Sequence, residues 1–323
     1  MLQLFKTNQF SVGILFFFYA AILKVGDFLP TVVNKTAPVT GYLHEQLLSR
    51  LPEPVLLRFF IGIAIVFIGG FLMSIITVRQ RLESEVTLLS GLFFILVMAL
   101  RLDYVMPSGL TIGAVCLILA LQNLLYSPNK VYNAIFLFNT GFFIGLAGLF
   151  YWSMWVFVLW AILGGFQLLG ARLKETLMIL TGFVIPYFFM AFEYFWNGHF
   201  SEFSGDLLFQ YFDATQIPLM GKNLKEWIAT GILSLLLLSA LFSYNKNIKK
   251  KQVIVRRKIN VIYWMIPFIP LVVILQSSAQ VYDYALFAIP LSVVMAFQFT
   301  RLKSGAAELL HFILVAIAVY LSF

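Results

Sequence analysis

The chain has 323 residues, of which 61% are hydrophobic and only 11% charged, and 35 of them are Phe. A soluble domain of this size cannot bury so much apolar surface, so the composition excludes an ordinary globular protein. The formal net charge of +8 is typical of basic cytoplasmic loops in a multi-pass membrane protein and does not by itself indicate nucleic-acid binding.

The apolar stretches predict about eleven transmembrane helices, because roughly 20 apolar residues cross a bilayer as a helix. The fold class expected is therefore all-α, a polytopic helical bundle forming one integral-membrane domain over 1–323. The break between two spans at Phe150–Ser153 is the least clear in the sequence, and 131–170 could instead hold a re-entrant pair. In chain order, the expected spans are 10–25, 54–78, 86–101, 108–126, 131–150, 152–170, 176–197, 226–244, 260–276, 282–299 and 307–322.

The distribution of Lys and Arg predicts a cytoplasmic N-terminus. With that orientation the inner loops hold most of the basic residues, including a cluster at 246–258, while most acidic residues lie outside. The positive-inside rule favours this arrangement, and an odd number of spans then places the C-terminus in the periplasm. We expect the chain in a bacterial inner membrane.

Two predicted outer loops are long enough to carry function. The first, Val25–Glu53, contains the stretch Val39–Leu51, whose leucines recur at helical spacing and predict a short amphipathic helix along the membrane interface. The second, Asn197–Lys225, is rich in aromatic and acidic residues. The basic inner loop 245–260 is typical of an anchor on anionic lipid, with docking of a cytoplasmic protein as the alternative.

Glycines recur where helices should touch one another. Gly141, Gly145 and Gly148 form one smooth face, and similar pairs occur at Gly69–Gly70 and Gly164–Gly165. Small residues let membrane helices approach closely, so these positions predict packing within the chain. The single cysteine, Cys116, lies inside a predicted span and excludes an internal disulfide.

Motifs for nucleotide chemistry are absent from the sequence, and the three histidines lie far apart, so we expect no cofactor and no nucleic-acid partner. The best chemical candidates are Asp27 and Asp103, each of which follows a predicted span at the outer boundary. Two carboxylates there would bind a divalent metal or deprotonate a hydroxyl. The ordinary alternative for each is a solvated acid at a helix end.

The order of these features resembles that of membrane-embedded glycosyltransferases with the C-type fold, which use polyprenyl-phosphate sugars. That order is matched by an acid after the first span at Gly26-Asp27, by an interfacial stretch at 39–51 and by an outer turn at Asp103. The order and composition of the residues in 139–186 match it as well. The resemblance runs over about 10–197. It implies a helical core at 1–197, with 198–323 adding the aromatic loop and the C-terminal spans.

The same resemblance implies that Asp27 is the catalytic base and Asp103 a second acidic ligand or an acceptor-binding residue. Arg58 or Arg101 would bind the carrier phosphate, because a guanidinium grips phosphate with two hydrogen bonds. Tyr104, next to Asp103, and His199, in the aromatic outer loop, complete the expected substrate-binding set.

Three functions follow as hypotheses. The first is transfer of a sugar from a polyprenyl-phosphate carrier at the outer leaflet. The second is a non-catalytic scaffold or accessory subunit of an envelope-assembly or secretion complex, contacting its partner through loop 245–260; a relative of the transferases that has lost catalysis fits here. The third is a transporter or flippase. The Phe-rich, basic-looped sequence also resembles a family of polytopic inner-membrane proteins from Bacteroidota, a likeness that supplies no mechanism.

Overall fold

The computed structural model describes residues 10–24, 41–48, 50, 55–83, 87–100, 107–127, 133–170, 173–198, 200, 203, 224–248, 251–276 and 281–322. All of its regular structure in these ranges is helical. Among the described residues, nine helical stretches are long and apolar enough to cross a membrane. The chain is thus a multi-pass helical membrane protein, as predicted from its sequence.

The helices follow the predicted spans closely. They are α1 (Phe10–Leu23), α2 (Val55–Arg79), α3 (Leu89–Ala99), α4 (Gly109–Tyr126), α5 (Asn133–Phe150), α6 (Phe157–Leu169), α7 (Leu173–Trp196), α9 (Leu224–Ile248), α10 (Val253–Tyr263), α11 (Met265–Ile274), α12 (Ala288–Arg301) and α13 (Ser304–Ser322). Three short helices accompany them: η3 (His44–Leu48), η5 (Trp152–Val156) and η6 (Val281–Phe287).

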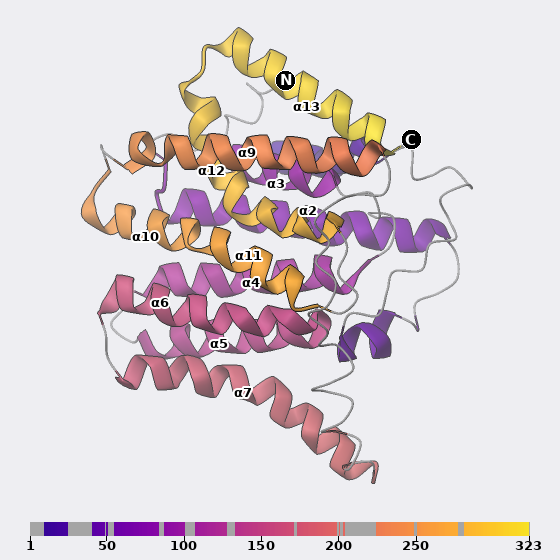
Figure 1. The fold of residues 1–323 in the computed structure, drawn as a ribbon, viewed down its shortest axis with the longest axis vertical. Helices are drawn as coiled ribbons and strands as arrows, with labels where there is room; N and C mark the ends of the chain where they lie inside the picture. Colours follow the sequence, from indigo (N-terminus) through magenta and orange to yellow (C-terminus); the bar gives the residue numbers. More distant parts are fainter. Residues whose placement is uncertain are drawn as a thin grey trace.

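The helices run back and forth, so their connections gather at two ends of the bundle (Figure 1). One end, here called the basic end, carries the C-terminal ends of α2, α4, α6, α9 and α12. The other, here called the opposite end, carries η3, η5 and η6 and the C-terminal ends of α7 and α11. The positive-inside rule predicts that the basic end is cytoplasmic.

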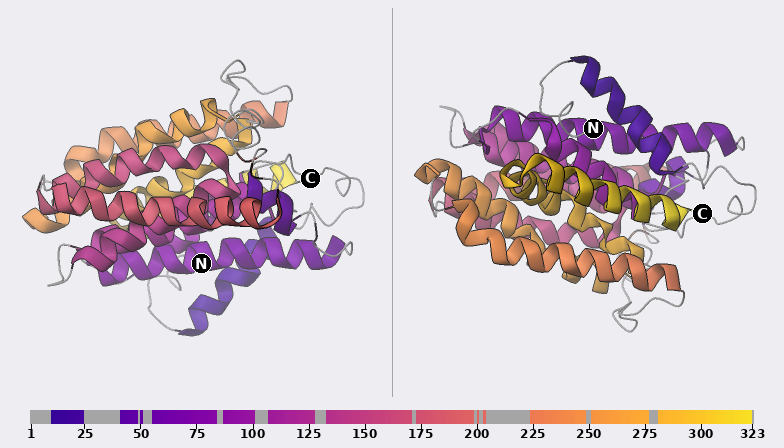
Figure 2. Two further views of the ribbon diagram at one scale, coloured as in Figure 1. Left: turned by 90° about the horizontal axis from the view of Figure 1, so that it is seen from below. Right: turned by 90° about the horizontal axis from the view of Figure 1, so that it is seen from above.

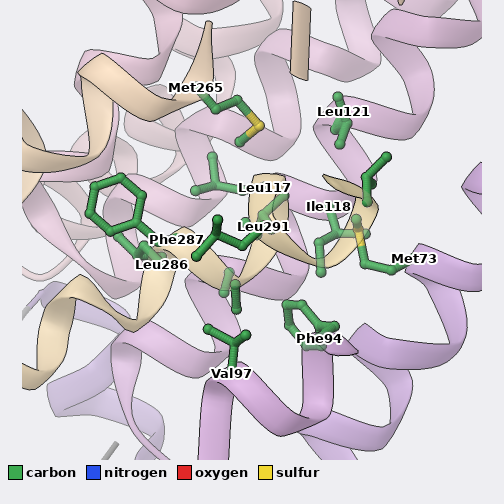
Figure 3. Packing of buried hydrophobic residues seen from close by; sticks show 14 of the residues in the cluster. Met73, Phe94, Val97, Leu117, Ile118, Leu121, Met265, Leu286, Phe287 and Leu291 are labelled. Atoms are coloured by element: carbon green, nitrogen blue, oxygen red, sulfur yellow. The ribbon is translucent and has the colours of Figure 1, made fainter. Parts of the chain in front are cut away.

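Two buried helices, α3 and α12, lie side by side in the core. Every residue of α3 is buried, and so are nearly all residues of α12. Apolar side chains from α2, α3, α4, η6 and α12 meet between them (Figure 3). With eleven residues, α3 is only about 16 Å long at 1.5 Å per residue. It is shorter than the predicted span 86–101, whose ends lie partly outside the described residues.

The uncertain region 131–170 forms two separate helices rather than a re-entrant pair. The extended backbone of Tyr151 ends α5, and η5 then leads straight into α6. Both stretches, Asn133–Phe150 and Trp152–Leu169, are long enough to span a membrane.

Loop 245–260 is a correction to our prediction, because most of it is helical. α9 continues to Ile248 and α10 already begins at Val253, seven residues before the expected start of the span at 260. The reason is amphipathicity: Ile259 and Ile262 are buried while Arg256 and Arg257 are exposed. A break at Trp264 separates α10 from α11, because Pro267 has no amide hydrogen to donate to the carbonyl of Tyr263.

The predicted glycine face is confirmed as a contact between α5 and α7. A side chain at Gly141 would clash with the carbonyl oxygen of Ile179, and one at Gly145 would lie 2.5 Å from that of Phe183. From the other helix, Gly182 presses on the carbonyl oxygen of Phe138. The two backbones therefore touch along their length. At the periphery, α1 packs against α2, α3 and α13; the right-hand view of Figure 2 shows α1 at the edge of the bundle and α13 across the face toward the viewer.

Candidate functional site

Most of the predicted site residues lie outside the described residues: Asp27, Arg101, Asp103, Tyr104 and His199. Their roles stay predictions. Described residues that flank them lie toward the opposite end, because α1 ends there at Leu23 (Figure 2), and α3 ends and α4 begins there, at Ala99 and Gly109 (Figure 1). The helix ends that precede Asp27 and Asp103 in the sequence, those of α1 and α3, therefore lie toward the same end of the bundle.

Arg58 is the one predicted site residue that the structure describes. It lies in the first turn of α2, near the opposite end, and its side chain is half-buried. Its neighbours Leu56, Leu57 and Phe60 are exposed and form an apolar surface around it. A guanidinium near the end of a span, with apolar residues on either side, reaches the membrane boundary by extending its stem.

A buried polar cluster that sequence reasoning missed lies at this same end. The hydroxyl of Tyr151 donates a hydrogen bond to Oδ2 of Asp283 over 3.3 Å. The backbone N–H and the hydroxyl of Ser153 both donate to Oε1 of Gln276, at 3.3 and 2.8 Å. All four residues are buried, and Asp283 is only 3% exposed. We call them the polar cluster.

The local folding of η5 and η6 explains why these side chains meet. Tyr151 and Ser153 sit at the turn between two antiparallel helices, where a short 3₁₀ segment replaces the regular helix. Gln276 follows the end of α11, and Asp283 is in the 3₁₀ segment that leads into α12. η5 and η6 both contact α11, and η6 also contacts α3 and α4. Asp283 therefore stands close to the helices that flank Asp103.

Sequence signals for this cluster exist but are weak. A single polar residue within a predicted span, such as Gln276, usually makes a hydrogen bond between helices, and the bond to Ser153 is of that kind. Asp283 stands between two tyrosines at the start of a predicted span. That position is typical of a solvated helix-end acid, and only the packing of η6 buries it.

A collar of aromatic rings lies beside the cluster. Trp152 and Tyr187 meet edge to face at 6.2 Å, and Tyr42 of the first outer segment packs on Tyr194 at 5.6 Å. Phe203, from the aromatic segment after α7, contacts Tyr194 at 5.7 Å and stacks on Phe200 at 5.8 Å. This collar joins the two loops that sequence analysis singled out.

The predicted amphipathic helix of the first outer loop is present as η3 and its flanking turn, and it joins the collar. Tyr42 and Leu43 pack against α5 and α7, whereas Leu47 is exposed. Burial, together with the hydrogen bond to Glu193 and its negative charge, raises the pKa of Tyr42 well above its usual range. The hydroxyl of Tyr42 thus keeps its proton and shares it with Glu193.

Within the described ranges, no three His, Cys, Asp or Glu side chains lie close enough to hold a metal ion. His44 is buried in η3 at the opposite end, whereas Nε2 of His311 in α13 bonds the hydroxyl of Tyr19 at 3.0 Å. These two histidines belong to different parts of the bundle. A metal at Asp27 and Asp103 lies outside the described residues and stays an untested alternative.

No family model matches this sequence, and no curated protein matches it. A solved structure does: the crystal structure of ArnT from Cupriavidus metallidurans bound to undecaprenyl phosphate matches with a TM-score of 0.51. The match covers 95% of this chain at 13% sequence identity. The fold resembles that of ArnT. Almost every described helix takes part in this likeness, including those beyond the predicted core 1–197.

The likeness to ArnT concerns the fold alone, because 13% identity is too low to carry residue roles across. The chain spans 62% of the length of the ArnT chain. A multi-pass helical membrane protein with an ArnT-like fold agrees with the resemblance predicted from the order of features in the sequence. The likeness to a Bacteroidota family stays a prediction.

Proposed function

We propose that this chain is a bacterial inner-membrane protein that binds a polyprenyl phosphate at the opposite end and transfers a sugar from it to an acceptor hydroxyl. The observation that carries the proposal is the ArnT-like fold over 95% of the chain, because ArnT was solved with undecaprenyl phosphate bound. Undecaprenyl phosphate belongs to the lipid class that the sequence resemblance implies.

The arrangement of the opposite end supports this chemistry. The half-buried Arg58 and the polar cluster belong to that end, and so do the ends of α1 and α3, after which Asp27 and Asp103 follow in the sequence. Aromatic collars commonly stack on the apolar faces of sugars, and the described rings from Tyr42 to Phe203 form such a surface. Arg58 supplies a cation near the lipid boundary for the carrier phosphate.

In the proposed reaction the carboxylate of Asp27 accepts the proton of the acceptor hydroxyl. The hydroxyl oxygen then bonds to the anomeric carbon of the sugar as the bond from that carbon to the phosphate oxygen breaks. Polyprenyl phosphate leaves with the electron pair, and Arg58 or Arg101 holds its negative charge. Asp103, Tyr104 and His199 are proposed to position the substrates.

Binding and transfer are tested separately. Binding of undecaprenyl phosphate to the full chain in nanodiscs is measured by native mass spectrometry for the wild type, for Arg58→Gln and for Arg79→Gln as a matched control at the basic end. We expect Arg58→Gln alone to weaken binding. Equal binding by all three forms, or no binding by the wild type, contradicts the carrier site.

Transfer is measured as release of undecaprenyl phosphate from an undecaprenyl-phosphate hexose by membranes that contain the chain. We expect Asp27→Asn to lower the rate at least a hundredfold with carrier binding unchanged, as for loss of a general base. A fully active Asp27→Asn variant removes Asp27 as the base. Binding without turnover in the wild type assigns the fold to a carrier-binding protein that does not catalyse transfer.

A second candidate function is a scaffold in a membrane complex, and the surfaces of α7, α9 and α13 favour it. The rest of the chain leaves most residues of these long helices uncovered. In the apolar stretch of α9, only 6% of the residues are buried. Membrane helices of a partner would pack there. A stable stoichiometric partner recovered in mild detergent, and lost on charge reversal across 246–258, supports this function.

A further inference from the structure

A groove opens on the outer surface of the bundle between α9 and the α10–α11 pair, away from the polar cluster. Its volume is about 480 Å³, within the range of about 300–1,000 Å³ for small-molecule sites. Leu241 and Tyr244 line it from α9, and Asn260, Trp264 and Pro267 line it from the other side. Figure 1 shows these helices side by side on the face toward the viewer.

Two tyrosines hold the floor of the groove. The hydroxyl of Tyr244 donates to Oδ1 of Asn260 at 3.0 Å, and the hydroxyl of Tyr263 donates to the carbonyl oxygen of Ala240 at 3.2 Å. The two rings meet edge to face at 5.0 Å. The side-chain nitrogen of Asn260 takes part in none of the hydrogen bonds seen among the described residues, so it is left to donate into the groove.

The walls of the groove face the bilayer. Leu241 and Trp264 are each about half exposed, although both are large and apolar. The proline-induced break at Trp264 lies in the middle of one wall. An apolar groove open to lipid, with an amide donor near one end, fits one flexible hydrocarbon chain that carries a polar head.

Positive charge marks the end at which such a head would lie. Arg257 and Arg256 precede Asn260 by three and four residues on α10, which is the spacing of neighbours on one helix surface. Both arginines are exposed, as is Lys246 near the end of α9. Nε of Arg256 donates to the carbonyl oxygen of Lys251, which leaves the guanidinium of Arg257 as the freer of the two.

We propose that this groove binds an anionic glycerophospholipid, with one acyl chain between α9 and α10–α11 and its phosphate at Arg257 and Arg256. The site lies toward the basic end and is separate from the proposed carrier site, so it stands independently of the proposed function. Basic residues beside transmembrane helices recognise anionic headgroups by the same charge complementarity.

The test uses the full chain in nanodiscs of phosphatidylcholine with a trace of phosphatidylglycerol that carries a photoreactive diazirine in its acyl chain. After irradiation, we expect cross-links concentrated on Leu241–Tyr244 and Tyr263–Pro267. Unlabelled phosphatidylglycerol should compete, whereas added phosphatidylcholine should not. Cross-links spread equally over the exposed faces of α2, α7 and α13, or equal competition by phosphatidylcholine, would overturn the proposal.

Charge variants give the second arm. Each basic residue near an anionic headgroup contributes about 1 kcal/mol, or about fivefold in affinity. Arg257→Gln should therefore weaken phosphatidylglycerol binding about fivefold, and Arg256→Gln with Arg257→Gln about thirtyfold. Lys303→Gln is the matched control, because Lys303 is exposed at the same end but belongs to the connection between α12 and α13.

Both arginines are exposed, so the variants should fold, and their thermal unfolding in detergent checks this directly. Wild-type binding by the double variant, or an equal loss of binding in Lys303→Gln, would show that the groove does not select the lipid by its charge. Either result contradicts the proposal. Cross-links between two copies of the chain at these helices would assign the groove to self-association instead.

Discussion

The hydroxyl of Tyr151 and the carboxylate of Asp283 form a hydrogen bond across 132 residues of sequence, at a point where both side chains are buried. This bond ties the turn between α5 and α6 to the segment that leads into α12. A buried acid of this kind needs its donors, because an unpaired polar group away from water is costly. The polar cluster therefore holds together the end of the bundle that the proposed reaction uses.

Tyr151→Phe should destabilise the protein by about 1–3 kcal/mol, because it leaves a buried carboxylate with one donor fewer. Asp283→Asn keeps an oxygen that accepts the same bond and should cost less. Both are measured as the midpoint of thermal unfolding in detergent. An unchanged midpoint for Tyr151→Phe would show that this hydrogen bond contributes nothing to the stability of the opposite end.

Gln276→Leu should be more damaging than Ser153→Ala. The leucine leaves two buried donors of Ser153 without their acceptor, whereas the alanine removes only the hydroxyl bond. We expect a loss of about 2–4 kcal/mol for Gln276→Leu and about 0.5–1.5 kcal/mol for Ser153→Ala, from thermal unfolding of each variant. The reverse order would show that the Ser153 hydroxyl stabilises the protein through contacts other than its bond to Gln276.

The helices of this fold follow from hydropathy, but their pairing does not. A bilayer core admits only helices whose backbone groups are satisfied internally, so long apolar stretches had to be spans, and α4, α5 and α13 begin and end within a few residues of prediction. The start of α10 was missed because its Arg and Lys residues lower the mean hydropathy, while the apolar face that buries Ile259 and Ile262 needs a partner helix to be recognised.

The site was less predictable than the fold. Asp27 and Asp103 were chosen because acids at span ends are visible in a sequence, and they lie outside the described residues. Asp283 is also an acid at the end of a predicted span. Its burial, however, depends on where η6 packs, and no local sequence pattern encodes that. The burial of Lys258 could not be predicted either. In the sequence it is one more cation of a basic loop, but in the structure it is 3% exposed and bonds Gln80.

Gly141→Ala should disrupt the pairing of α5 and α7, because the added methyl would collide with the carbonyl oxygen of Ile179. Overpacking of this kind costs about 1–3 kcal/mol. The matched control is Gly231→Ala in α9, where a methyl meets open space and alanine should stabilise the helix by about 0.5–1 kcal/mol. Thermal unfolding in detergent should move the two variants in opposite directions, and a shared direction would contradict the close α5–α7 contact.

Lys258→Ala should destabilise the basic end, whereas Arg257→Ala should not. Nζ of Lys258 donates to Oε1 of Gln80 at 2.6 Å and so fastens α10 to the end of α2. Loss of a hydrogen bond from a charged group costs about 1.5–3 kcal/mol, while exposed substitutions usually fall within about 0.5 kcal/mol. Equal unfolding midpoints for the two variants would show that Lys258 does not fasten these helices.

The orientation in the membrane can be tested with single cysteines at the two ends. Cys116 is buried inside α4, so a Cys116→Ala background removes the native thiol without touching either end. Glu45, in η3, and Lys303, between α12 and α13, are both exposed, and they belong to opposite ends. In intact spheroplasts, a membrane-impermeant maleimide should label the Glu45→Cys variant and leave the Lys303→Cys variant unlabelled until the membrane is opened. This follows because basic connections stay in the cytoplasm. The inverse pattern would put the polar cluster on the cytoplasmic side, and transfer at the outer leaflet by a site at this end would then be excluded.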